Sequence, residues 1–464
     1  MNSEKSTAGR PAAFARRASI TAGSGEGALE GCIYKGNAMT TLPRMFKRIL
    51  ILAGTAILGF AVCLGVERVH GSWSLLPNRD LDRASSYVRD VLKTVNENYV
   101  DPAASGYEPL SKLAIHGMVE TLDPHSEYLE VKDNEELEED LDGEYGGIGV
   151  EIEMDKGALT VTSPIPGGPG AKAGILEGDQ IVSVDGKAVD RGVPMDKVVD
   201  KLRGKPRTHV KVGLFRPIPG KHLELDVVRE VVKIVSVRGA RIMDGTTGYL
   251  QIREFSDHTG EQFDDALNGL LAKGIDSLVI DLRNNPGGLL DAAVDVAEPF
   301  FRKGRLIVYT QGRKPADREN YYSETDGEPL KLPVAVLING ETASAAEIVA
   351  GALKDSGSAV IVGERSYGKG SVQTIFKLRN GEGLRLTTAH YFTPSGALIN
   401  AHGITPQVEV VMTPDEDAKL ERQVSRPDIT DPVEFRERFD FSPVEDRQLE
   451  AALDVLRVAR SLSR

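Results

Sequence analysis

The sequence predicts a mixed α/β fold in which a layered core of sheet and helices carries an inserted β-rich module and follows an N-terminal helical segment. Three observations predict it. Apolar residues recur at helical spacing over residues 80–99 and again over 110–122. Short β-type segments separated by glycine turns fill residues 145–232. From residue 248 onward, strand-like runs alternate with helical ones, which is typical of a layered α/β core.

The composition describes a conventional folded protein. The chain has 464 residues, of which 41% are hydrophobic and 27% charged, so we expect about three structural units. A net charge of −13 argues against broad electrostatic attraction to nucleic acid. The two cysteines are Cys32 and Cys63, which excludes a disulfide framework, a cysteine-ligated zinc or a cysteine nucleophile after residue 63.

Residues 49–66 form a run of 18 uncharged residues that predicts a membrane segment. As a helix the run would span about 27 Å, close to the roughly 30 Å of a hydrocarbon core, so it fits an anchor or a signal peptide. No clear small-residue cleavage pattern follows it, which favours an uncleaved anchor. Arg44, Lys47 and Arg48 precede the run and keep that side in the cytoplasm. We therefore expect the remainder in the periplasm or cell envelope, anchored in the inner membrane or exported through a signal peptide.

The chain is expected to divide into six parts. Residues 1–38 are rich in Gly, Ala and Ser without an apolar period, which predicts a non-functional extension and a translation start at Met39. An acidic run at 135–142 is interpreted as a solvated helix face or a linker. The expected parts are the extension 1–38, a signal or membrane anchor 39–70, an N-terminal helical segment 71–143, a β-rich module 144–232, an α/β core 233–412, and a charged, peripheral C-terminal tail 413–464 with one helix.

A glycine-rich turn opens the β-rich module. Glycines let several main-chain N–H groups point at one spot, which suits the terminal carboxylate of a peptide, and such a peptide can add as a strand to the module's edge. Residues 163–189 then continue with SPIPGGPGAKAGILEGDQIVSVDGKAV, and in this order the segments resemble a PDZ domain. The expected peptide-binding residues are Gly146, Gly147, Ile148, Gly149 and Val150.

Ser344 and Lys369 are the predicted catalytic pair. Ser344 follows a buried-type strand at 334–338 and starts a helix, where a serine is often only an N-cap. About 15 Å of helix leads away from it and a returning strand covers about 16 Å, so Lys369 can lie back beside Ser344. A phosphate-binding loop is the weaker interpretation of SYGKGS, because the residues lack the required spacing.

A lysine acts as a base only when it is neutral, so this site must lower the lysine pKa from its model value of about 10.4. Burial and the lack of a close carboxylate would do this. Gln373, four residues after Lys369, can hold the amine without adding a charge. The oxyanion would need preorganised donors, for which the candidates are the main-chain N–H groups of Ala345, Gly287 and Gly288.

Together these motifs resemble the carboxyl-terminal processing proteases, also called tail-specific proteases, over about residues 80–412. The resemblance rests on the PDZ-like segment and on LDPHSEYL (122–129), DLRNNPGG (281–288), TASAAE (342–347) and YGKGSVQ (367–373), which occur in the family's order. It implies that Ser344 is the nucleophile, Lys369 the general base and Gln373 the residue that orients the lysine. It also implies a PDZ domain that captures substrate C-termini and gates access to the dyad.

Two further residues are weighed at the site. His125 is interpreted as structural, and it is the alternative base if Lys369 is not one. Glu347 is either a third catalytic member or, as we favour, a carboxylate that the helix N-terminus stabilises. The histidines show no paired metal-ligand spacing, so no metal and no cofactor is expected.

The sequence therefore predicts a serine endopeptidase of the cell envelope that cuts proteins at or near their C-termini through an acyl-enzyme. The expected partners are protein or peptide substrates with free C-termini, an envelope adaptor protein, the inner membrane and further copies of the chain, with no nucleic acid. The main alternative is a non-catalytic PDZ binding or scaffold protein. A second alternative is an amidase or esterase that uses the same dyad on small molecules.

Overall fold

The structure is a computed structural model that describes residues 78–155, 157–190, 193–378, 380–424, 426, 429 and 431–462. The chain divides into two compact units, Met1–Thr94 and Val95–Arg464. The predicted extension and membrane segment lie outside the described residues. Within the described part, no helix is both long and apolar enough to cross a membrane.

The N-terminal helical segment has the two helices that the apolar spacing predicts and a third helix that contains the acidic run. They are α2 (Arg79–Asn98), α3 (Tyr107–Glu120) and α4 (Val131–Asp142), with the short strand β1 (Glu127–Leu129) between the last two. The acidic run falls in α4, whose only fully buried residue is Asn134. Gly143 ends α4 in a left-handed conformation at φ 69°, as glycines often do after a helix.

The β-rich module forms the predicted sheet around its own apolar core. Its six strands lie in the order β3-β4-β5-β7-β8, with β6 beside β5, so β3 is at one edge. The core contains Ile148, Val161, Val212 and Leu214 together with Val198 of a helix. The strands are β3 (Val150–Asp155), β4 (Ala158–Pro164), β5 (Gln180–Val184), β6 (Lys187–Ala188), β7 (His209–Arg216) and β8 (Lys221–Val228), and the helices are α5 (Pro169–Ala173) and α6 (Met195–Leu202).

A two-stranded ribbon joins this module to the rest of the chain. Strand β2 (Glu144–Gly147) enters the module and pairs antiparallel with β9 (Glu230–Lys233), which leaves it. The module is thus an insertion whose entry and exit strands lie side by side.

The α/β core is a six-stranded sheet in the order β10-β11-β12-β15-β16-β19. All neighbours are parallel except β10 and β11. Every residue of β12 and β15 is buried, as expected of parallel strands covered on both faces. The strands are β10 (Val237–Met243), β11 (Thr247–Ile252), β12 (Ser277–Asp281), β15 (Val334–Ile338), β16 (Ala359–Gly363) and β19 (Val408–Glu409).

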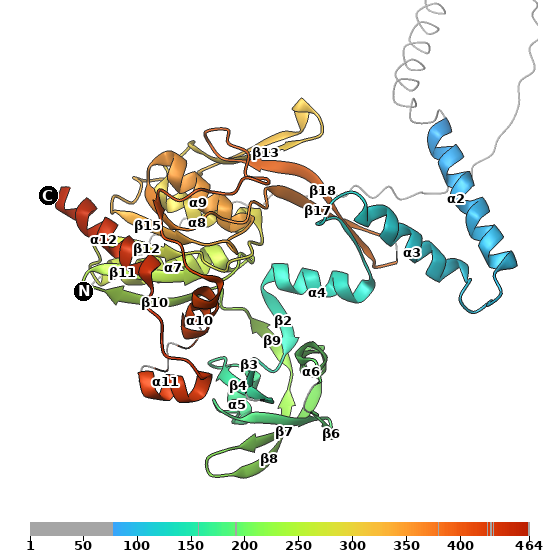
Figure 1. Cartoon of the computed structure of the whole chain (residues 1–464), viewed down its shortest axis with the longest axis horizontal. Helices are drawn as coiled ribbons and strands as arrows, with labels where there is room; N and C mark the ends of the chain where they lie inside the picture. The colour runs from blue at the N-terminus through green and yellow to red at the C-terminus, as the bar shows by residue number, and fades with distance from the viewer. Residues whose placement is uncertain are drawn as a thin grey trace, which may run out of the picture. The chain divides into compact units, whose positions relative to one another are not determined.

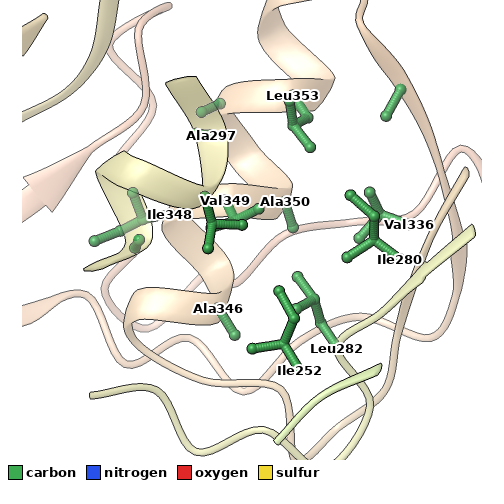
Figure 2. Close-up of a cluster of buried hydrophobic side chains, with 14 of the residues drawn as sticks. Ile252, Ile280, Leu282, Ala297, Val336, Ala346, Ile348, Val349, Ala350 and Leu353 are labelled. Carbon is green, nitrogen blue, oxygen red and sulfur yellow. The ribbon is translucent and has the colours of Figure 1, made fainter. Parts of the chain in front are cut away.

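Helices α7 (Thr259–Ala272), α8 (Leu290–Ala297) and α9 (Ala345–Ser356) cover one face of this sheet (Figure 1). Figure 2 shows how closely α9 packs: Val349 and Ala350 lie among Ile252, Ile280 and Val336. Small alanines on α9 let its backbone approach the sheet, and this close packing sets where the start of the helix lies.

A second sheet stands beside the core. Its order is β1-β18-β13-β14, with β17 also paired to β18. The strands are β13 (Leu306–Gly312), β14 (Arg318–Tyr322), β17 (Ser371–Lys377) and β18 (Gly383–Phe392), and two short 3-10 turns, Glu298–Phe300 and Pro315–Asp317, flank β13. Strand β1, from the segment before the β-rich module, pairs with β18 in this second sheet.

The C-terminal tail is not peripheral, in contrast to the prediction. It forms three helices, α10 (Pro414–Val424), α11 (Pro432–Phe439) and α12 (Arg447–Leu462). Helix α12 covers the other face of the core sheet, where Ala452, Leu453 and Leu456 pack against Tyr249 and Val279. The high charge of the tail suggested a solvated segment, but charged residues of α12 such as Asp454 and Arg457 are exposed while its apolar stripe packs against the sheet.

Candidate active site

Ser344 lies where strand β15 passes through a turn into helix α9. Its backbone has φ 56° and ψ −118°, a conformation that a non-glycine residue rarely adopts, and the residue is 9% exposed. Backbone strain of this kind costs about 1–3 kcal/mol and is concentrated at functional sites. A serine on a sharp strand-to-helix turn is also the arrangement that presents a nucleophilic hydroxyl at a sheet edge.

Lys369 lies on the loop between β16 and β17 and is half-buried. Burial lowers the pKa of its amine, and the positive charge of Arg385 lowers it further. Both effects favour the neutral amine that a base requires. The sequence-based expectation that burial would depress this pKa is confirmed, while the charge of Arg385 was not foreseen.

Glu347 joins the two predicted catalytic residues. One carboxylate oxygen, Oε2, accepts hydrogen bonds from the main-chain N–H groups of both Ser344 and Lys369, each at 2.8 Å. The other oxygen, Oε1, accepts from the Gly368 N–H at 2.8 Å and the Ser366 hydroxyl at 2.5 Å. The main chains at Ser344 and Lys369 are therefore bonded to the same carboxylate.

The environment of Glu347 is unusual for a carboxylate. The residue is fully buried, and burial raises its pKa, although the four hydrogen bonds act in the opposite direction. Glu347 does stand in the first turn of α9, as the helix-dipole interpretation required, but that interpretation missed its bonds to the lysine loop. The Ser-x-x-Glu spacing of a capping box is the signal that could have indicated the bond to Ser344.

The predicted oxyanion turn packs directly against Ser344. Gly287 has φ 101°, and a methyl group in place of its hydrogen would lie 2.6 Å from Cβ of Ser344 and 2.9 Å from the nitrogen of Ala345. The N–H of Gly287 donates to Asn285 Oδ1 at 2.8 Å, so this amide is already engaged. Ala345 and Gly288 carry the remaining candidate donors.

Hydrogen bonds join the predicted oxyanion turn to the turn that carries Ser344. Asn285 accepts the Ala343 N–H at 2.9 Å, and Asn339 donates to Asn284 at 2.7 Å. Arg283, which precedes Asn284, is 5% exposed and pairs with Asp281 at 2.6 Å and with Asp446 at 2.8 Å. Asp446 belongs to the C-terminal tail, which therefore contributes a side chain beneath this turn.

Gln373 lies on β17 and is half-buried. Its Nε2 group donates to Ser371 Oγ and to Thr387 Oγ1, both at 3.0 Å. The Thr387 hydroxyl also donates to Gln373 Oε1 at 3.4 Å. The predicted role of Gln373 toward the Lys369 amine stays a prediction. His125 lies in the electrostatic neighbourhood of Lys369: burial lowers the pKa of the histidine, and the lysine charge lowers it further.

Comparison with known proteins identifies the family. The profile of Peptidase family S41 matches residues 246–410, and that of the PDZ domain matches residues 160–215. The chain is 40% identical over 325 residues to a carboxy-terminal-processing protease of Bartonella bacilliformis, covering 69% of this chain and 74% of that protein. It is 33% identical over 374 residues to the carboxy-terminal processing protease CtpA of Bacillus subtilis, covering 79% of this chain and 78% of that protein.

This chain belongs to the carboxy-terminal processing proteases of peptidase family S41. The predicted family and the predicted mixed α/β fold are thereby confirmed. A solved structure of a photosystem II D1 C-terminal processing protease is 32% identical and covers 69% of this chain and 91% of that chain, with a TM-score of 0.41.

In this protease the PDZ module offers a groove beside its edge strand β3. A cavity of about 150 Å³ lies between β3 and helix α6. Val150 and Ile152 contribute from the strand, and Val199 and Leu202 from the helix, with Arg203 at its end. The predicted carboxylate-binding residues are divided between β2, the following turn and the start of β3, and Ile148 and Gly149 line the cavity.

Among the described residues, no group of three or more His, Asp or Glu side chains is arranged to hold a metal ion.

Proposed function

We propose that this protease is a serine endopeptidase of the cell envelope that cuts proteins at or near their C-termini with Ser344 as nucleophile and Lys369 as base. The observation that carries the proposal is the shared acceptor, Glu347 Oε2, which bonds the main-chain N–H groups of both residues. The lowered pKa of Lys369 supports its role as the base.

The chemistry follows from these positions. Neutral Lys369 takes the proton from the Ser344 hydroxyl as Oγ forms a bond to the scissile carbonyl carbon. The resulting oxyanion is stabilised by the main-chain N–H of Ala345, at the positive end of α9, and by that of Gly288. Lys369 then passes the proton to the leaving amine as the C–N bond breaks, and an acyl-enzyme remains.

Deacylation repeats the sequence with water. Lys369 removes a proton from a water molecule, which attacks the ester carbonyl, and the same donors stabilise the second oxyanion. The proton returns to Ser344 Oγ as the ester bond breaks, which releases the new C-terminus. Gln373 is proposed to orient the Lys369 amine through both half-reactions.

Substrate recognition is assigned to the PDZ groove. A peptide C-terminus would add antiparallel to the edge strand β3, with its carboxylate at the turn of residues 146–150 and its last side chain in the apolar cavity beside α6. The substrates are then proteins with free, apolar C-termini. An envelope adaptor, self-association and attachment to the inner membrane through residues 49–66 complete the proposal.

The test is degradation of an unfolded reporter protein with an apolar C-terminus, by wild type, Ser344→Ala and Lys369→Ala across pH 6–9. We expect loss of cleavage in both variants and a wild-type rate that rises with pH. Equal cleavage by all three proteins would remove the dyad. Binding of the reporter without cleavage by any of them would favour the PDZ scaffold alternative.

A further inference from the structure

A turn on the N-terminal side of the PDZ module is organised around one carboxylate. Asp123 Oδ1 accepts the main-chain N–H groups of His125 at 2.8 Å and Ser126 at 2.9 Å, and Oδ2 accepts the Ser126 hydroxyl at 2.8 Å. Burial acts to raise the pKa of Asp123, but these hydrogen bonds outweigh it and lower the pKa. The carboxylate is therefore ionised at neutral pH and holds the turn in one conformation.

Ser126 carries the turn into the second sheet. It is 5% exposed, and its hydroxyl oxygen accepts the main-chain N–H of Thr387 on β18 at 3.1 Å. The Thr387 hydroxyl in turn accepts the Nε2 group of Gln373 on β17 at 3.0 Å. Three successive hydrogen bonds thus connect Asp123 to the glutamine that follows Lys369.

The strand pairing alone does not determine the direction of the Gln373 side chain. The register of β17 and β18 shifts between Val372 and Gln373, so the ladder is irregular at this residue. Irregularities of this kind re-aim side chains and are frequent next to active sites. The side-chain bonds of Gln373 to Thr387 and Ser371 therefore determine where its amide points.

Residues 125–127 also hold Arg385, the positively charged residue near Lys369. Strand β1 pairs antiparallel with β18, with Glu127 opposite Arg385. Arg385 donates to the His125 carbonyl at 3.3 Å and to the Glu127 carboxylate at 2.6 Å. One short segment, residues 123–127, thus contacts the supports of both Gln373 and Arg385.

We propose that the turn of residues 123–126 is a positioning element of the active site, in which Ser126 acts through Thr387 to hold the Gln373 amide that orients Lys369. The inference rests on the proposed Ser344–Lys369 dyad. Ser126 is a positioning residue that touches neither substrate nor the reacting atoms. In this proposal, residues 123–126, which precede the inserted PDZ module in the sequence, control how well the Lys369 amine is aligned.

The test measures the rate at which a fluorophosphonate labels Ser344 in the full-length chain, from pH 6 to pH 10, because labelling reports the nucleophile and base without a protein substrate. The variants are Ser126→Ala, Ser126→Thr, Gln373→Ala and the Ser126→Ala/Gln373→Ala double variant. We expect Ser126→Ala to label about 10-fold more slowly at pH 7.5, with its pH midpoint shifted upward. A loosely held amine reaches water more often, so burial lowers its pKa less.

Two comparisons separate positioning from mere stabilisation. Ser126→Thr keeps the hydroxyl and is expected to label within about twofold of wild type. The double variant is expected to label no more slowly than Gln373→Ala alone, because the effect of Ser126 passes through that side chain. Arg385 on β18 and His125 in the turn interact electrostatically with Lys369, and Glu347 on α9 accepts its main-chain N–H; none of these three residues is changed.

The matched control is Thr374→Ala. Thr374 lies next to Gln373 on β17, and its hydroxyl pairs with Thr388 of β18 at 2.7 Å, so the variant removes the same group from the same pair of strands. We expect wild-type labelling. If Ser126→Ala proves unstable in a thermal melt, Thr387→Val tests the same link, because it removes only the hydroxyl that Gln373 contacts.

The outcomes also distinguish this inference from the proposed function. The positioning role alone would be overturned if Ser126→Ala labelled at the wild-type rate with an unchanged pH midpoint. It would also be overturned if the double variant labelled more slowly than Gln373→Ala by the same factor by which Ser126→Ala slows the wild type. Labelling of Lys369→Ala at the wild-type rate would overturn the dyad. Absence of labelling in wild type, with Ser344 accessible to the probe, would overturn both.

Discussion

The turn that carries Ser344 and the PDZ groove are built in opposite ways. Around Ser344, main-chain N–H groups from two loops converge on the buried carboxylate of Glu347, and a Cβ added at Gly287 would overlap Ser344. The PDZ groove is an open strand edge beside a cavity of about 150 Å³ lined mainly by apolar side chains. The structure around Ser344 depends on individual hydrogen bonds, whereas peptide binding in the groove would depend on the area and shape of its apolar surface.

This difference predicts how the two regions respond to mutation. Buried polar networks lose a large part of their function when one partner is removed, because the remaining donors are left unpaired. Apolar contact at a groove changes gradually with the size and charge of the side chain. The following substitutions test the contrast from the largest expected effect on cleavage to the smallest.

Replacing Glu347 is expected to have the largest effect. Glu347→Ala leaves three main-chain N–H groups and the Ser366 hydroxyl without their acceptor, and each unpaired buried group costs about 1–3 kcal/mol. We expect a loss of cleavage of about 10³-fold or more, measured with the unfolded reporter, together with a lower melting temperature. Glu341→Ala, an exposed residue in the preceding turn, is the matched control and should cleave normally.

Gly287→Ala tests the close contact between the oxyanion turn and Ser344. The alanine would adopt φ 101° and place its methyl group 2.6 Å from Cβ of Ser344, so the turn must move. Moving the turn displaces the adjacent proposed donor, the main-chain N–H of Gly288. Loss of one oxyanion donor typically costs about 10²–10³-fold, so we expect an effect of that order on kcat. Gly340→Ala is the control, because a methyl group there meets open space at an ordinary φ. Similar activity of the two variants would contradict the contact.

A charge in the PDZ groove should give a smaller effect of a different kind. Val199→Asp places a carboxylate in the apolar cavity, where it repels a peptide's terminal carboxylate. We expect KM for the reporter to rise about 10-fold, equivalent to about 1.4 kcal/mol, with kcat nearly unchanged. Lys197→Asp, exposed on the same helix α6, is the control. A fall in kcat alone would show that the groove acts on catalysis rather than on binding.

The pH dependence tests the electrostatic support of Lys369. Arg385 lowers the pKa of the lysine, so Arg385→Gln should raise it and move the rising limb of the pH–rate profile to higher pH. Below the midpoint we expect a loss of about 2–5-fold, as is typical for the interaction of partly exposed charges, and no loss at high pH where the lysine is neutral in both proteins. Arg385→Lys keeps the charge and should restore the profile. A shift toward lower pH would contradict the assigned sign.

The smallest effect on catalysis is expected from the far face of the sheet. Leu456 of α12 is 1% exposed, so Leu456→Ala should lower the free energy of unfolding by about 2–5 kcal/mol. Because α12 lies on the face opposite α9, cleavage per folded molecule should stay near the wild-type value. Val458→Ala, 59% exposed on the same helix, should change neither stability nor activity by much. Both quantities follow from denaturant unfolding and active-site titration.

Several features of the fold and site could be predicted from local sequence. The apolar periods located α2 and α3, and the buried-type run at 334–338 coincides with β15. The position of Ser344 after a buried strand and the distance covered by α9 and β16 indicated that Lys369 returns to it. Such features are visible because helix and strand periods, glycine turns and short chain lengths are local properties.

Long-range contacts could not be predicted in the same way. The pairing of Arg283 with Asp446 links residues 163 positions apart, and the bond between Ser126 and Thr387 links residues 261 positions apart. Both depend on which elements become neighbours after folding. The prediction that the charged C-terminal tail is peripheral was wrong for the same reason. The apolar stripe of α12 packs on a face of the sheet that forms only in the folded chain.

The sequence by itself determined the family, the mixed α/β fold and the residues proposed to do the chemistry, because their types and spacing carry that information. Tertiary structure alone decided that Glu347 also bonds the loop of Lys369, that Arg385 lies near Lys369, and that α12 packs on the sheet. Each of these depends on burial and on side chains meeting across elements, and no local pattern of residues encodes such a meeting.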